Sequence, residues 1–159
     1  MLRSIANRTG GCNAMAARWL LAPLALVLIA GCNEQPQLTG VLAAHDARVR
    51  APVPGASNTA AYVELHNAGE QAVQVVRATS SHVRAIEFHR TARRNNVLTM
   101  RRLEAIVVPA QDTVRLEPGG LHLMLFGVTA LPDSIDIQLF FDDGRTQTIS
   151  FRRVALGAN

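Results

Sequence analysis

Short segments in which apolar and polar residues alternate fill most of the chain after residue 58. Successive side chains of a β-strand point to opposite faces, so a period of two is typical of strands with one buried face. The candidate strands span residues 59–66, 72–79, 84–89, 98–103, 113–116, 121–126, 135–141 and 146–153. Turn-forming residues separate them, and no helical period is sustained over twelve residues. The pattern predicts an all-β domain, and a Greek-key sandwich is its natural architecture.

The first 31 residues have the pattern of an export signal. Three arginines, Arg3, Arg8 and Arg18, precede an apolar run over 19–30. That run is too short to cross a bilayer as a helix, but it suits the core of a signal peptide. It ends in Leu28-Ile29-Ala30-Gly31-Cys32. This ending resembles the bacterial lipobox, which implies cleavage before the cysteine and lipid attachment to it. A plain signal peptide followed by a chance cysteine is the alternative.

These features predict three regions of the chain. Residues 1–31 form a lipoprotein signal peptide, residues 32–45 are the lipidated Cys32 with a polar tether, and residues 46–156 are the β-domain. We expect a periplasmic protein that is bound to a membrane through its lipid. Asn33 rather than aspartate follows the cysteine. In enteric bacteria this choice favours the outer membrane over the inner one.

Charge and cysteine content narrow the possible functions. The formal net charge is +4, but three of the sixteen basic residues lie in the signal, so the remaining chain is almost neutral. Export and an aromatic content of only 4% make a nucleic-acid partner unexpected. Cys12 leaves with the signal and Cys32 carries lipid, so the domain has neither a free thiol nor a disulfide. Any metal site must therefore do without thiolate.

The two methionines that remain after signal cleavage, Met100 and Met124, both have a histidine nearby in the predicted structure. His122 and Met124 are two positions apart in one strand, so they share a face opposite the leucines that alternate with them. A hairpin turn centred on residues 94–95 would place His89 directly opposite Met100 on the paired strand. Thioether and imidazole donors favour Cu(I) over harder divalent ions, whereas zinc usually takes cysteine, histidine or carboxylate.

The spacing is His89, ten residues, Met100, twenty-one residues, His122, one residue, Met124. It resembles the signature of the PCu(A)C family of periplasmic copper chaperones, which supply the dinuclear copper centre of cytochrome c oxidase. The similarity covers residues 47–154. It implies a cupredoxin-like β-fold, one Cu(I) per chain held by these four side chains, and transfer of copper to an oxidase subunit or assembly factor. Many members carry methionine directly after the first histidine, where this chain has Arg90. Strand alternation from His89 predicts that Arg90 faces away from the site.

Several alternatives stay open at this point. A copper buffer or resistance lipoprotein would have the same site without a dedicated oxidase recipient. An enzyme is not expected, because two thioethers favour the reduced ion and no other catalytic constellation is recognisable. We expect a monomer. Glu87 is either a hydrogen-bond partner of His89 or a solvated carboxylate. The arginines around the predicted hairpin form either a docking patch for an acidic partner or a solvated turn: Arg90, Arg93, Arg94, Arg101 and Arg102.

Overall fold

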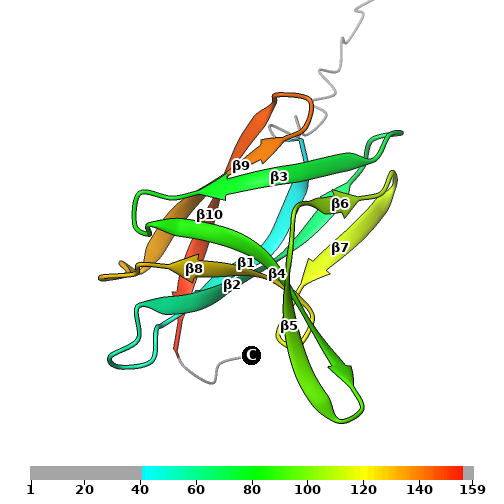
Figure 1. Ribbon diagram of the computed structural model, residues 1–159. Helices are drawn as coiled ribbons and strands as arrows, with labels where there is room; N and C mark the ends of the chain where they lie inside the picture. Colours follow the sequence, from blue (N-terminus) through cyan, green and yellow to red (C-terminus); the bar gives the residue numbers. More distant parts are fainter. Residues whose placement is uncertain (1–40, 156–159) are drawn as a thin grey trace, which may run out of the picture. The chain divides into compact units, whose positions relative to one another are not determined.

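The computed structural model describes residues 41–155, which contain ten strands and no helix, and therefore no helix that could cross a membrane (Figure 1). The predicted signal peptide and Cys32 lie outside the described residues. The strands are β1 (Ala43–Arg50), β2 (Asn58–Asn67), β3 (Val73–Thr79), β4 (Ala85–Arg94), β5 (Val97–Leu103), β6 (Ile106–Val108), β7 (Asp112–Leu116), β8 (Leu121–Phe126), β9 (Ser134–Phe141) and β10 (Thr146–Val154). The predicted all-β class is confirmed.

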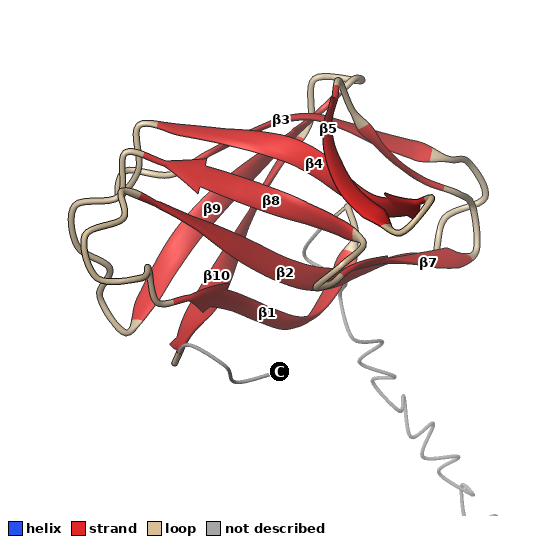
Figure 2. Ribbon diagram, turned by 60° about the horizontal axis from the view of Figure 1, so that its bottom comes forward, coloured by secondary structure: helices blue, strands red, loops and turns tan. Residues whose placement is uncertain are grey.

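All ten strands belong to one mixed sheet, in the order β5-β4-β8-β7-β2-β1-β10-β9-β3-β6. The sheet curls into a barrel-like form, with β4, β8, β2 and β1 on the near wall of Figure 2 and β9 and β3 behind them. Two strands share one side of β2, because β8 pairs with residues 58–61 and β7 with residues 63–67. β5 is an edge strand, and its hairpin with β4 projects from the body of the domain (Figure 1).

The core lies inside this curled sheet and follows from the alternation in the sequence. In β9 the side chains of Ile135, Ile137 and Leu139 are buried, while the residues between them are exposed. Leu123 and Leu125 of β8 face the same interior and are 1% and 0% exposed. Each such aliphatic side chain contributes about 1.5–3 kcal/mol by leaving water. The described residues therefore enclose a hydrophobic core of their own.

Two strands were not predicted. β1 has one fully buried side chain, Val49, and a bulge between His45 and Arg48 interrupts its pairing with β2. That bulge breaks the alternation that identifies a strand. β6 has only three residues, which is too short for a periodic pattern to show. The sheet begins at Ala43, inside the segment predicted as tether.

Candidate metal centre

β8 presents His122 and Met124 on the face opposite its core leucines. His122 and Met124 both line a cleft of about 330 Å³, while Leu123 and Leu125 are buried in the core. The alternation predicted for this strand is therefore present.

The predicted pairing of His89 with Met100 is wrong. In the β4–β5 hairpin His89 lies opposite Arg102, and Met100 lies opposite Thr91. Met100 is nevertheless two positions from the partner of His89, so both side chains are on the same face of the hairpin. Diagonal neighbours of this kind are typically about 7–8 Å apart, within reach of long side chains.

The register differs because the turn is one residue further along than predicted. Arg94 is the last residue of β4 and pairs with Val97, so Asn95 and Asn96 are the two turn residues. Both have positive φ, 49° and 62°, as a two-residue type I′ hairpin turn requires. Asparagine tolerates this conformation better than arginine does, which explains why the turn is centred here.

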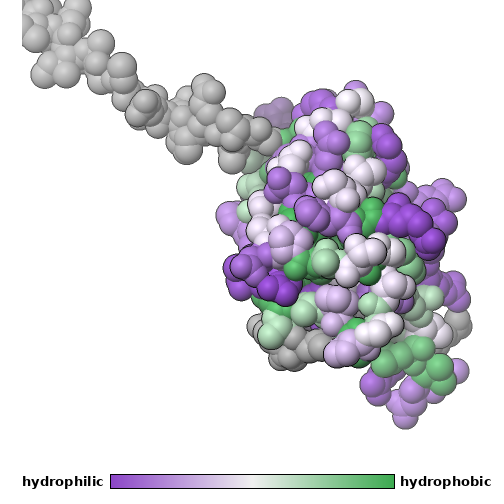
Figure 3. Space-filling view, turned by 90° about the vertical axis from the view of Figure 1, so that its left-hand side faces the viewer, coloured by the Kyte–Doolittle hydropathy of each residue, from purple (hydrophilic) through white to green (hydrophobic). Residues whose placement is uncertain are grey.

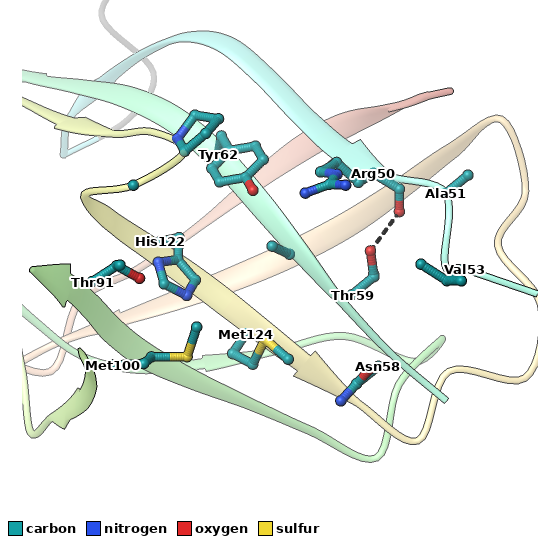
Figure 4. A pocket seen from close by; sticks show the side chains of 13 residues that line it. Arg50, Ala51, Val53, Asn58, Thr59, Tyr62, Thr91, Met100, His122 and Met124 are labelled. Carbon is teal, nitrogen blue, oxygen red and sulfur yellow. Dashed lines mark hydrogen bonds between the residues drawn. The ribbon is translucent and has the colours of Figure 1, made fainter. Parts of the chain in front are cut away.

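The pairing of β4 with β8 joins the two halves of the proposed site. His89 lies directly opposite His122, and their ring centroids are 5.9 Å apart. Residues that pair across neighbouring strands of a sheet have their side chains on the same face. The pairings of β5 with β4 and of β4 with β8 therefore place His89, Met100, His122 and Met124 on one face of the sheet. Figure 4 shows the side chains of Met100, His122 and Met124 gathered along β8.

The cleft gives this face access to solvent. It is lined by Met100, Met124 and His122 on one side and by residues such as Arg50 and Tyr62 on the other (Figure 4). His89 is not among its lining residues. Of the four, Met100 is the exposed one, with 53% of its surface accessible, whereas His122 is 4% exposed.

The surroundings of His122 favour its neutral form. Its Nδ1–H donates to the carbonyl oxygen of Gly120 at 3.1 Å, which leaves the Nε2 lone pair available. Burial is the main cause that lowers the pKa of His122 below its ordinary value. The Gly120 hydrogen bond opposes this shift, and the nearby His89 adds to it. A metal ligand must be unprotonated, so these conditions suit coordination.

His89 is oriented by an acidic neighbour. Its Nε2 lies 3.0 Å from Oε2 of Glu87, whose Oε1 is 3.5 Å from Nη1 of Arg102. The other ring nitrogen, Nδ1, is buried and has no hydrogen-bond partner among the described residues. A buried unsatisfied nitrogen costs about 1–3 kcal/mol. A metal ion bound at Nδ1 would remove that cost, and histidine ligands commonly donate their second N–H to a carboxylate, as here.

Arg90 and His66 are not part of the proposed site. Arg90 pairs with Leu121 and Arg101, so alternation places it on the opposite face from His89, as predicted. His66 is bonded through Nδ1 to Thr113 Oγ1 at 3.0 Å. Within residues 41–155, no group of three or more histidine, cysteine or acidic side chains could share a metal ion.

Comparison with known proteins identifies relatives. A family model described as "Putative lipoprotein LpqE-like" matches residues 42–152. "Putative lipoprotein Lxx21020" of Leifsonia xyli subsp. xyli is 35% identical over 100 residues, which are 60% of each chain. "Uncharacterized protein RP573" of Rickettsia prowazekii is 27% identical over 100 residues, 60% of this chain and 55% of that one. The chain thus spans little more than half the length of these relatives.

Solved structures share the fold. The copper-bound PCuAC domain from PmoF2 has a TM-score of 0.62 at 23% identity, covering 73% of this chain and 94% of that domain. The solution structure of CuI-DR1885 from Deinococcus radiodurans has a TM-score of 0.56 at 26% identity, covering 78% of this chain and 82% of the other. The strands described above therefore form the same kind of β-barrel as PCuAC domains.

Proposed function

This chain belongs to the LpqE-like family, and from that premise we propose that it is an extracytoplasmic copper metallochaperone. One Cu(I) ion is held by Nδ1 of His89, Nε2 of His122 and the thioether sulfurs of Met100 and Met124. The observation that carries the proposal is the state of the two imidazoles. Each ring has one nitrogen in a hydrogen bond, the buried Nδ1 of His89 has no hydrogen-bond partner among the described residues, and both rings lie on the face that carries the two methionines.

The donor set selects the ion. Two thioethers and two neutral imidazoles are soft, uncharged ligands, which favour Cu(I) over Zn²⁺ or Mg²⁺. The copper named in the descriptions of the PmoF2 domain and of DR1885 supports the same choice. The exposed Met100 leaves the ion accessible from one side, as release to a partner requires.

The chain's location follows from its proposed processing. Cleavage after residue 31 leaves Cys32 to carry lipid, residues 32–45 to act as tether and residues 46–156 to form the copper-binding domain. The relative described as a lipoprotein supports this reading. We place the protein in the periplasm as a monomer, anchored to a membrane, with the outer membrane favoured by Asn33.

The recipient we propose is a copper-accepting oxidase subunit or an assembly factor of cytochrome c oxidase. The second candidate function is a copper buffer or resistance lipoprotein, which would use the same four ligands without a dedicated recipient. Incubation of the Cu(I)-loaded chain with an apo oxidase subunit fragment separates the two. A chaperone is expected to load the fragment with copper faster than the same amount of Cu(I) supplied from a chelator. A buffer protein is expected to load it no faster than the chelator does.

The metal assignment is tested on the processed chain, residues 33–159. Competition with a Cu(I)-selective chelator is expected to give about one Cu(I) per chain, and a parallel titration is expected to show little Zn²⁺ binding. His122→Gln removes a donor and lowers Cu(I) affinity, whereas the matched control His66→Gln, whose ring bonds to Thr113, leaves it unchanged. Zinc bound more tightly than Cu(I) would contradict the assignment.

A further inference from the structure

The β4–β5 hairpin projects beyond the barrel and is exposed to solvent (Figure 1). Every residue of β5 from Val97 to Arg102 is exposed, and only Leu103 is half-buried. The hairpin base is attached to the body by the bond from the Thr91 amide to the Gly120 carbonyl, 3.0 Å long. None of the described side chains of residues 91–101, the projecting part of this ribbon, belongs to the core, so core packing does not account for them.

Those side chains are dominated by positive charge. Arg90, Arg93, Arg101 and Arg102 are all exposed, and Arg90 lies directly opposite Arg101. Like charges in directly opposed positions destabilise a strand pair. In the part of the chain that the structure describes, only Arg102 of these four has an acidic partner, Glu87. The remaining charge is free to attract an anionic surface.

The face of the hairpin that carries the metal site also presents apolar surface. Leu98 is two positions from Met100, so both side chains are on that face, and they are 62% and 53% exposed. Arg93 lies opposite Leu98 on the same face. In the space-filling view, apolar and hydrophilic surfaces lie side by side on the lobe at the lower end of the molecule (Figure 3). Methionine and arginine are both enriched at protein–protein interfaces.

Access to the proposed copper ion passes over this hairpin. The side chain of His89 is 13% exposed and His122 is 4% exposed, so strands shield both imidazoles. Met100 is the exposed donor. An acceptor ligand that replaces the donors one at a time can enter through the cleft beside Met100, next to the hairpin.

We propose that this hairpin face, defined by Arg93, Leu98, Met100 and Arg102, docks a protein acceptor whose copper-binding segment is surrounded by acidic side chains. Arg90 and Arg101 lie on the opposite face of the two-stranded ribbon and add only to the long-range attraction. The inference rests on the proposed copper function and names the chemistry of the partner. Charge attraction speeds the encounter and orients the acceptor, while Leu98 makes apolar contact next to the exchanging donor. A membrane surface is the less suitable occupant, because lipid offers no soft donor to receive Cu(I).

The test uses two synthetic acceptor peptides with the same Cys-Gly-Gly-Cys copper-binding segment, flanked by four glutamates in one and by four glutamines in the other. Cu(I) loading of the processed chain is measured first, and its absence would overturn the proposed function without bearing on docking. Binding of each fluorescent peptide to the apo chain is then measured by anisotropy. At low salt the glutamate peptide is expected to bind at least about tenfold more tightly, and the advantage shrinks as salt screens the charges.

Two variants with equal loss of charge locate the surface. Arg90→Gln/Arg93→Gln/Arg101→Gln removes three hairpin charges, Arg93 from the docking face and the other two from the opposite face, and it is expected to reduce the preference for the glutamate peptide at low salt severalfold. The control Arg145→Gln/Arg152→Gln/Arg153→Gln removes three exposed charges near or on β10 and should retain that preference. Equal loss in both variants, or no loss in the first, would overturn the proposal. So would hairpin-dependent binding to phosphatidylserine vesicles without any peptide preference, which would make the hairpin a membrane contact.

Discussion

Glu87 is expected to control how strongly the chain holds copper although it is not a ligand. Its Oε2 accepts a hydrogen bond from His89 Nε2 at 3.0 Å, and its other oxygen is 3.5 Å from Arg102. This contact fixes the ring so that the buried Nδ1 is the free nitrogen. Glu87→Gln preserves the shape but removes the negative charge that orients the imidazole and strengthens its donor nitrogen.

The size of the effect follows from the position of the contact. Loss of a carboxylate partner behind a histidine ligand typically costs about 10–100-fold in metal affinity. This range corresponds to about 1.4–2.7 kcal/mol. The fold should change far less, because the Glu87 side chain is 29% exposed and pairs of that kind contribute at most about 1 kcal/mol. We therefore expect weaker Cu(I) binding with an almost unchanged melting temperature.

Competition against a Cu(I) chelator gives the affinity, and thermal unfolding of the apo chain gives the stability. Glu104→Gln is the matched control, since Glu104 is an exposed carboxylate beyond the end of β5. The reasoning is refuted if Glu87→Gln and Glu104→Gln bind Cu(I) equally well. If His89→Gln is equally without effect, His89 is not a ligand at all.

Three further outcomes are expected. Met124→Leu and Met100→Leu keep the apolar volume, so the free energy of unfolding should change by less than about 1.5 kcal/mol. Chelator competition should nevertheless show a large loss of Cu(I) affinity. A lower melting temperature with copper binding intact would mean that both are only packing residues. The folded pKa of His122 is lowered by burial, so the unfolded chain binds more protons below pH 6.5. Apo stability is therefore lost as pH falls from about 6.5 through the folded pKa, and denaturant unfolding at pH 7 and pH 5 should show a smaller loss in His122→Gln; equal losses would contradict this. Cys32→Ala should abolish lipidation and detergent partitioning without changing the fold, and a variant that still partitions like the parent would exclude Cys32 as the anchor.

The sequence allowed the face of each proposed donor to be predicted more reliably than its partner. Alternation alone separates His122 and Met124 from the leucines of β8. The predicted register of the hairpin was wrong, because the residue opposite His89 is Arg102 and not Met100. The two residues are two positions apart, so both have their side chains on the same face of the strand. Turn geometry at Asn95 and Asn96 decides that register, and it also decides that Arg102 rather than Met100 lies opposite His89.

The juxtaposition of the two imidazoles could not have been predicted from local pattern. His89 and His122 are neighbours because β4 pairs with β8, a pairing between strands separated by three others in the chain. The contact of Glu87 with His89 was left open because spacing alone cannot distinguish a hydrogen bond from a solvated carboxylate. Burial of the ring and the 3.0 Å distance decide in favour of the hydrogen bond.

The parallel pairing of β1 with β10 has a kinetic consequence for folding. Arg48 pairs with Arg152, and just before β1 the Leu42 amide bonds to the Gln147 side chain, 105 positions away. Until β10 is in place, β1 can pair only with β2 and keeps one open edge. High contact order of this kind places folding in the range of about milliseconds to seconds. The folding chain therefore passes through a period in which an unpaired edge is exposed to aggregation and proteolysis.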